Sequence, residues 1–173
     1  MTLRLKEREL VAVGVSVAAG CKPCTDYHVK AVREAKATDD EIRQAIDDAI
    51  SVRRNASDVM RGYGLCHLGE TAKAVEGGCT KPTTRIKELI SIAAAFAVNC
   101  TTNLEKHLAV AKALGVSGEE IQDVIKLATF IKGKAASHVE KLVAPQEAVE
   151  NVTKAKPAPK TATTGGCGCS AAD

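Results

Sequence analysis

The stretch that decides the fold is ELVAVGVSVAAGCKPCTDYH at residues 9–28, because a second version of it, ELISIAAAFAVNCTTNLEKH, follows at residues 88–107. Both versions start with Glu-Leu and an apolar run, reach a cysteine, and end on a histidine at the same spacing. A shift of 79 positions aligns them without a gap. The sequence therefore predicts two copies of one structural unit.

Each copy contains the same succession of predicted helices. The first helix, at about 4–19 or 83–98, is apolar on most sides, so we expect it to be buried. The second begins near the cysteine and runs to about residue 36 or 114.

A third helix in each copy is predicted from its N-terminal signature. Thr38 is followed three residues later by Glu41, and Ser117 is followed at the same spacing by Glu120. This is the capping-box pattern, in which the two side chains satisfy free backbone N–H groups at a helix start. No alternating strand pattern occurs, so we predict an all-α fold built from two tandem repeats.

Composition and pattern divide the chain into four segments. We predict a first repeat at 1–60, a glycine-rich connector at 61–82, a second repeat at 83–145 and a flexible Lys/Pro/Ala tail at 146–173. Hydrophobic residues make up 45% but aromatics only 2%, so small aliphatic side chains must form the core.

The charge and the aromatic content argue against nucleic-acid binding. The net charge is +3, and three lysines of the C-terminal tail supply most of the surplus. No basic patch is therefore indicated on the folded part. Single-stranded nucleic acid would also need aromatic platforms, which the composition does not supply.

The N-terminal region imitates an export signal, with basic residues before an apolar run that ends at Cys21. Glu7 and Glu9 interrupt the basic segment, and the same apolar run returns in mid-chain. The run is also too short to span a membrane. We therefore expect a core helix, no membrane association and a cytoplasmic protein. Seven cysteines, an odd number, then indicate redox or metal chemistry rather than a secreted disulfide framework.

Cys21 and Cys24 are the candidate reactive pair. The sequence CKPC places two thiols within one helical turn at a helix start, where free N–H groups favour thiolate. His28 follows on the same helical face and can accept or return a proton. Glu9 can reach this cluster only if the first helix packs antiparallel against the second, and it would then orient the imidazole.

Other interpretations of these residues stay open. A structural zinc site could use the two cysteines with His28 and a fourth ligand from Cys167 or Cys169. Glu9 could be a paired core charge. Haem attachment is not indicated, because the residue after the second cysteine is not histidine.

The pattern Glu-x11-Cys-x2-Cys-x3-His on an alanine-rich helical repeat resembles the AhpD-like branch of the carboxymuconolactone decarboxylase superfamily, over about residues 3–143. The resemblance implies an antioxidant alkylhydroperoxidase or thiol–disulfide oxidoreductase with an AhpD-like helical fold, acting as a homo-oligomer, often a trimer. It implies Cys24 as the peroxide-reacting thiol, Cys21 as its disulfide partner, and Glu9 with His28 as the proton relay. Electrons would come from a dihydrolipoyl protein or a thioredoxin-like dithiol carrier.

The chain also departs from the family pattern. The familiar two-copy form carries its dithiol in the second half, whereas this chain carries it in the first. The second copy keeps Glu88, Cys100 and His107 but has Asn103 where a second cysteine would fall. It is either a degenerate, structural copy or a single-thiol site at Cys100. Family members without the dithiol can be decarboxylases, a chemistry that the retained CKPC disfavours.

Four further cysteines lie outside the repeats' reactive motif. Cys167 and Cys169 form a CGC pair near the end of the tail and could exchange disulfides with the CKPC pair, bind a soft metal or metalloid, or be dispensable. Cys66 and Cys79 of the connector could pair with each other or approach the tail, but the expectation is that they are simply partly buried.

The sequence thus predicts an enzyme that reduces hydroperoxides or disulfides through its dithiol, with no cofactor and no assigned metal. The alternatives are a thiol-rich metal-binding or metalloid-binding protein and, less favoured, a decarboxylase-like lyase. We expect His138 to be a structural residue.

Overall fold

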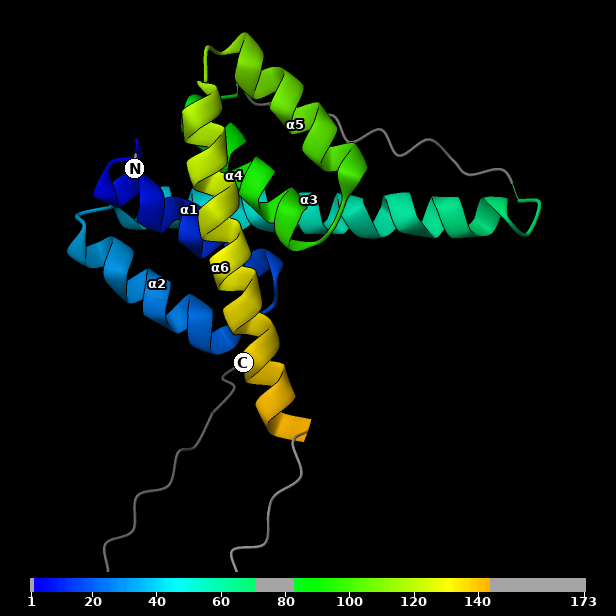
Figure 1. Cartoon of the computed structure of the whole chain (residues 1–173), viewed down its shortest axis with the longest axis horizontal. Helices are drawn as coiled ribbons and strands as arrows, with labels where there is room; N and C mark the ends of the chain where they lie inside the picture. The colour runs from blue at the N-terminus through cyan, green and yellow to red at the C-terminus, as the bar shows by residue number, and fades with distance from the viewer. Residues whose placement is uncertain (1, 71–82, 144–173) are drawn as a thin grey trace, which may run out of the picture. The chain divides into compact units, whose positions relative to one another are not determined.

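The computed structural model describes residues 2–70 and 83–143, and within these ranges the chain forms helices and no strand (Figure 1). The predicted all-α fold is therefore confirmed. The helices are α1 (Leu5–Ala18), α2 (Lys22–Glu34), α3 (Asp39–Cys66), α4 (Arg85–Ala97), α5 (Thr101–Ala113) and α6 (Gly118–Val143). None of these helices is both long and apolar enough to cross a membrane. Cys79, Cys167 and Cys169 lie outside the described residues.

The two repeats agree down to individual turns. Gly20, with φ of 71°, follows α1, and Asn99, with φ of 57°, follows α4 at the equivalent position. Lys36 and Gly115, with φ of 64° and 78°, likewise follow α2 and α5. Left-handed residues of this kind terminate helices. The chain therefore reverses in the same way before and after α2 and α5, the helices that begin next to Cys21 and Cys100.

Both predicted capping boxes are present. Thr38 Oγ1 accepts the Glu41 backbone N–H at 3.2 Å, and the Glu41 carboxylate accepts the Thr38 N–H at 2.8 Å. Ser117 and Glu120 exchange the same two hydrogen bonds, at 3.2 and 2.9 Å. These bonds fix the starts of the two long helices, α3 and α6.

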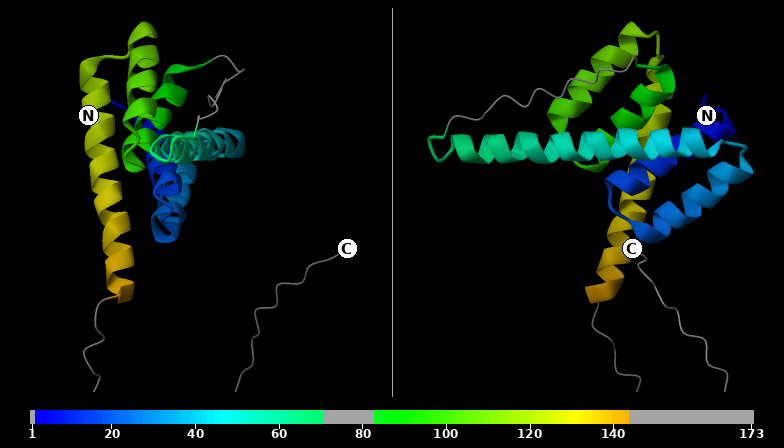
Figure 2. Two further views of the ribbon diagram at one scale, coloured as in Figure 1. Left: turned by 90° about the vertical axis from the view of Figure 1, so that its right-hand side faces the viewer. Right: turned by 180° about the vertical axis from the view of Figure 1, so that it is seen from behind.

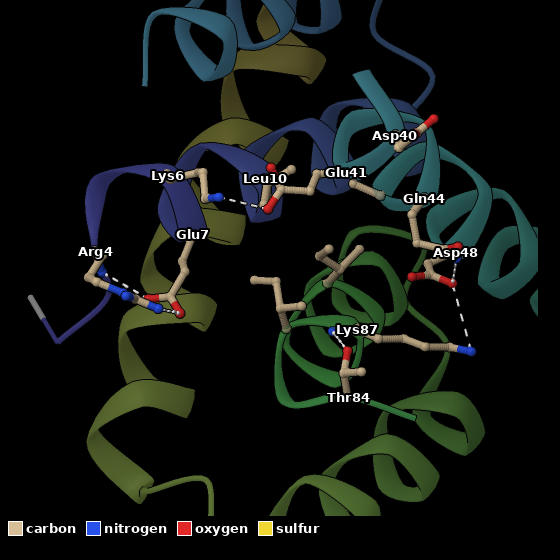
Figure 3. A pocket seen from close by; sticks show the side chains of 13 residues that line it. Arg4, Lys6, Glu7, Leu10, Asp40, Glu41, Gln44, Asp48, Thr84 and Lys87 are labelled. Atoms are coloured by element: carbon tan, nitrogen blue, oxygen red, sulfur yellow. Dashed lines mark hydrogen bonds and ion pairs between the residues drawn. The ribbon is translucent and has the colours of Figure 1, made fainter. Parts of the chain in front are cut away.

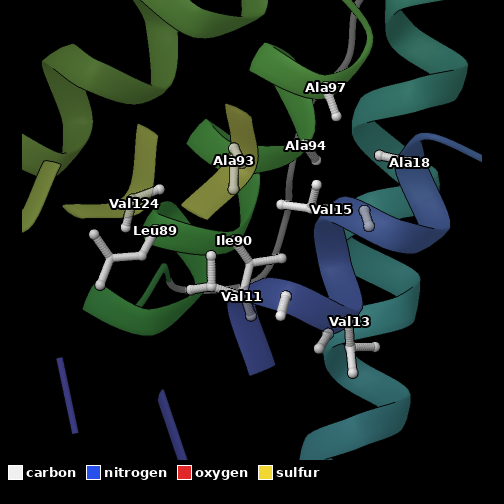
Figure 4. Packing of buried hydrophobic residues seen from close by; sticks show 14 of the residues in the cluster. Val11, Val13, Val15, Ala18, Leu89, Ile90, Ala93, Ala94, Ala97 and Val124 are labelled. Atoms are coloured by element: carbon white, nitrogen blue, oxygen red, sulfur yellow. The ribbon is translucent and has the colours of Figure 1, made fainter. Parts of the chain in front are cut away.

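The core is centred on α1 and α4, which pack against each other and against three further helices each. Their Val, Ile, Leu and Ala side chains interleave in a single cluster (Figure 4). Val11, Val13 and Val15 of α1 have no exposed surface, and neither do Leu89 and Ile92 of α4. The expectation that these two helices are buried is confirmed, with small aliphatic side chains doing the packing.

The third helix of each repeat also packs on the other repeat. Helix α6 contacts α1 and α2, while α3 contacts α4 and α5. The described residues before Ala144 accordingly form one compact unit rather than two. The site at the start of α2 is therefore bordered by a helix from the opposite repeat.

Ionic contacts repeat with the same register. Lys6 Nζ lies 2.7 Å from Glu41 Oε1, and Arg85 pairs with Glu120 at the equivalent positions. Both pairs join the first helix of a repeat to the start of its third helix. They are partly exposed, so we assign them a modest contribution to stability.

Glu7 links the two repeats electrostatically. Its carboxylate accepts hydrogen bonds from Arg4 at 3.1 Å and from Arg85 at 2.7 Å. The hydrogen bonds from Arg4, together with Arg85, lower the pKa of Glu7 to about 2. The side chain thus stays ionised at neutral pH and ties the start of α1 to the start of α4.

Helix α3 continues past residue 60, the predicted end of the first repeat, and ends at Cys66. Its second half extends past the other helices (Figures 1 and 2). Met60 and Tyr63 are exposed on this part, and so is Cys66. The expectation that Cys66 is partly buried is therefore wrong, because no other described helix covers this end of α3.

The close approach of α1 and α4 depends on Gly14. A Cβ atom at this position would lie 2.7 Å from Cγ2 of Ile90. We predict that Gly14→Ala lowers the free energy of unfolding by about 1–2 kcal/mol, since overpacking outweighs the better helix propensity of alanine. Urea denaturation followed by circular dichroism measures this.

Gly133 of α6 provides the matched control, because a Cβ atom there meets nothing within 4 Å. Gly133→Ala should raise the free energy of unfolding by up to about 1 kcal/mol. Equal stabilisation by both substitutions would contradict the packing described for α1 and α4.

Candidate functional site

Cys21 and Cys24 form a disulfide at the start of α2, with their Cα atoms 5.4 Å apart. The turn at Gly20 places Cys21 at the N-cap, where its N–H donates to Ser16 O at 3.0 Å. The Cys24 backbone N–H donates to Cys21 Sγ at 3.3 Å. Pro23 occupies the first turn, where its missing N–H costs no helical hydrogen bond. The local fold therefore brings the two predicted thiols into bonding distance and gives Cys21 Sγ a donor.

Glu9 and His28 meet beside this pair, because α2 turns back and packs along α1. Glu9 Oε2 lies 2.9 Å from His28 Nδ1. The other oxygen, Oε1, accepts hydrogen bonds from Arg8 at 2.7 and 3.1 Å. Glu9 is only 5% exposed, so both carboxylate oxygens are held in place by protein groups.

This contact fixes the proton arrangement on His28. An ionised carboxylate only accepts hydrogen bonds, so Nδ1 carries the proton that it donates to Glu9. The second ring nitrogen, Nε2, is then left to accept or release a proton. His28 follows Cys24 by one helical turn, on the same face of α2. The arrangement suits proton transfer at the cysteine pair.

The second repeat keeps the acid–histidine pair without the second thiol. Glu88 Oε2 lies 2.7 Å from His107 Nδ1, and Cys100 occupies the N-cap of α5. Asn103 replaces the second cysteine, is 4% exposed, and donates to Val52 O at 3.2 Å. This side chain now joins α5 to α3. Cys100 has no adjacent thiol with which to close a CxxC disulfide, as the sequence predicted.

His138 is a residue of this region that the sequence analysis missed. Among residues 2–70 and 83–143, the ligand atoms of Cys21, Cys24 and His138 lie within 4.8 Å of one another. His138 comes from α6, which crosses the start of α2. One signal was available: the equivalent residue of the first repeat is Val59, so the histidine is a departure from the repeat.

A cavity of about 640 Å³ opens beside the disulfide. One wall is the turn from Ala19 to Pro23, which includes Cys21 and Lys22, and the other is the last part of α6, which includes His138 and Lys141. The two cysteines are each 7% exposed. Cys21 lines this cavity and Cys24 does not, so the cavity gives small molecules a route to the Cys21 side of the disulfide.

A second cavity, of about 500 Å³, lies between α1, α3 and α4 (Figure 3). Its charged side chains contact one another: Arg4 pairs with Glu7, Lys6 with Glu41, and Lys87 lies 3.9 Å from Asp48. Burial raises the pKa of Asp48. Its lining residues, all in the described part of the chain, include no cysteine or histidine, so we do not place the chemistry there.

These features define an all-helical protein with a CxxC dithiol at Cys21 and Cys24. The chain belongs to the carboxymuconolactone decarboxylase family, in the AhpD-like superfamily, since the family model matches residues 2–59 and 67–144. Members of this family are mostly enzymes, either peroxidases or decarboxylases. Comparison with curated proteins finds no match to this sequence.

The two N-caps have nearly the same backbone, with φ and ψ of −97° and 100° at Cys21 and −94° and 100° at Cys100. We predict that Asn103→Cys gives the second repeat a CxxC disulfide with Cys100. Under mild oxidation the variant should lose two more thiols than the wild-type chain, as counted with a thiol reagent.

Asn103→Ser is the matched control, because it also removes the hydrogen bond to Val52 but adds no thiol. Peptide mass mapping should place the new disulfide between residues 100 and 103. If oxidation removes no more thiols from Asn103→Cys than from the wild-type chain, the two N-caps are not equivalent in geometry.

Proposed function

We propose that this protein is a thiol-dependent peroxidase or thiol–disulfide oxidoreductase. The observation that supports the proposal most is the Cys21–Cys24 disulfide at the helix start, with a carboxylate-bound histidine one turn further along α2. A family that includes peroxidases adds to this support. The substrate is a hydroperoxide or a disulfide that enters the cavity between the Gly20 turn and α6.

In the first step, the Cys24 thiolate attacks the distal oxygen of a hydroperoxide. The O–O bond breaks, the sulfur becomes a sulfenic acid, and the alkoxide leaves as the alcohol. His28 Nε2 takes the proton from the Cys24 thiol and returns it to the alkoxide. Glu9 holds the imidazole in the tautomer that this transfer requires.

In the second step, Cys21 attacks Cys24 Sγ. The sulfur–oxygen bond breaks, water leaves, and the Cys21–Cys24 disulfide forms. The dithiol has then lost two electrons, which the hydroperoxide has gained. The disulfide in the structure corresponds to this end state.

A dithiol donor would restore the reduced form. A donor thiolate attacks Cys24, and Cys21 leaves as a thiolate that the Cys24 backbone N–H stabilises. The second donor thiol then displaces Cys24 and completes the oxidation of the donor. A dihydrolipoyl or thioredoxin-like protein has the required chemistry, and the tail pair Cys167 and Cys169 stays a predicted intermediate carrier.

We also propose that the chain acts as a homo-oligomer, such as a trimer. Met60 and Tyr63 are exposed on the projecting half of α3, and Leu68 follows them. These side chains offer apolar area that a second copy could cover. Within residues 2–70 and 83–143, no contact favours the decarboxylase chemistry found elsewhere in the family.

We predict that Cys24→Ser abolishes hydroperoxide consumption supported by a small dithiol, because it removes the attacking sulfur. His28→Ala should lower kcat/KM by roughly 10²–10⁴-fold, the usual contribution of a positioned acid–base group. Steady-state loss of hydroperoxide measures both variants.

His107→Ala in the second repeat is the matched control, since it breaks the equivalent contact with Glu88 but not the dithiol site. It should keep kcat/KM within a few-fold of the wild-type value. Full turnover by Cys24→Ser would rule out the mechanism, and a larger loss in His107→Ala than in His28→Ala would place the chemistry in the other repeat.

A further inference from the structure

We propose that the reduced chain binds one Zn²⁺ ion through Cys21, Cys24 and His138. This metal site does not rest on the proposed peroxidase activity. It depends on a side chain from the second repeat that reaches the cysteine pair of the first.

The spacing of the three ligand atoms suits zinc. Sγ of both cysteines and a ring nitrogen of His138 lie within 4.8 Å of one another. Tetrahedral Zn²⁺ has Zn–S bonds of about 2.3 Å and Zn–N bonds of about 2.0–2.1 Å, which separates neighbouring ligand atoms by roughly 3.4–3.8 Å. Reduction of the disulfide allows the two sulfurs to separate to this distance. Only small side-chain movements are then needed.

The ligand types select the class of metal. Two thiolates and an imidazole are soft or borderline donors, which favour Zn²⁺ over Mg²⁺ or Ca²⁺. Both thiols release a proton when the metal binds, so the charge of Zn²⁺ is neutralised by the two sulfurs. This neutralisation matters because Lys22 and Lys141 line the same cavity and would oppose an uncompensated dication.

His138 takes the place of His28, the histidine ligand in the zinc alternative that the sequence left open. His28 is not a member of the three-residue group, and its Nδ1 is engaged by Glu9. The position of His138 on α6 lets it approach the cysteines from the opposite side of the cavity. His138 is partly buried, which keeps its imidazole near the sulfurs while leaving the site open to ions.

The repeat comparison provides independent support. The equivalent positions are Cys100 and Asn103 of the second repeat and Val59 of the first, which supply one ligand where the proposed site has three. The histidine and the second cysteine thus occur together at one site and are both missing from the other. A tetrahedral ion needs a fourth ligand, which water or a small thiol could supply from the cavity that Cys21 and His138 line.

Metal binding would be linked to the redox state. The disulfide holds the two sulfurs in a covalent bond, so only the dithiol form offers two thiolates. Oxidation by a hydroperoxide would consume both thiolates and two protons, yield the disulfide, an alcohol and water, and release the ion. The bound ion would in turn shield the thiols from oxidation.

The test uses the chain with Cys66, Cys79, Cys167 and Cys169 changed to serine, so that these four thiols do not compete for the metal. The chain is reduced with a phosphine and titrated with Co²⁺, whose thiolate charge-transfer and tetrahedral d–d bands report the ligands. Zn²⁺ affinity is then measured by competition with a chromophoric chelator. We expect one ion per chain. In His138→Ala the Zn²⁺ affinity should fall about tenfold or more.

Two controls separate this site from its alternatives. His28→Ala and His107→Ala should each weaken Zn²⁺ binding by less than about threefold. Loss of a true ligand should weaken it by about tenfold or more. The oxidised chain should show no thiolate charge-transfer band. If the four-serine chain is not folded by circular dichroism, the natural chain is compared with His138→Ala by the same titration.

The proposal is overturned if His138→Ala binds Zn²⁺ as tightly as its parent, if His28→Ala causes the larger loss, or if the oxidised chain gives the same cobalt spectrum. Loss of metal binding without loss of hydroperoxide turnover in His138→Ala would support the metal site and leave the peroxidase proposal intact. Full hydroperoxide turnover in Cys24→Ser, with Zn²⁺ binding by the parent chain lost in His138→Ala, would contradict only the peroxidase proposal.

Discussion

The packing of α1 against α4 is the contact on which the rest of the structure depends. Gly14 allows the two helices to approach closely at Ile90, and the valines, leucines and alanines around them form a single buried cluster. Because this pair is shared, the third helix of each repeat packs across both halves of the core. The chemical site is thereby built from one repeat and bordered by the other.

Much of this arrangement could be predicted from the repeated sequence. The apolar runs predicted the two central helices, the Thr38–Glu41 and Ser117–Glu120 pairs predicted the starts of the long helices, and the spacing of Glu9 and His28 predicted residues that the structure brings together. These features depend on helical periodicity and local hydrogen bonding, which one sequence displays directly.

The missed features depend on contacts between distant segments. His138 could not be assigned to the site because its approach to Cys21 requires knowing how α6 crosses the first repeat. The exposure of Cys66 could not be predicted either, since it depends on whether another helix covers the end of α3. Local patterns do not contain this information, although the Val59-to-His138 difference between repeats was visible.

The two repeats share the same helices and the same glutamate–histidine contact but differ at the second cysteine. Both hold a glutamate against a histidine, but the first places a second cysteine where the second repeat has Asn103, which bonds to the backbone of α3. In our account the first repeat performs the redox chemistry, and the second contributes structure and the α6 wall of the site.

The most direct test of this account is to trap the oxidised sulfur. A Cys21→Ser chain is treated with one equivalent of hydroperoxide and a sulfenic-acid reagent, and the modified peptide is located by mass spectrometry. The account predicts modification at Cys24 within the first turnover. Modification at Cys100 instead, with Cys24 unmodified, would contradict it.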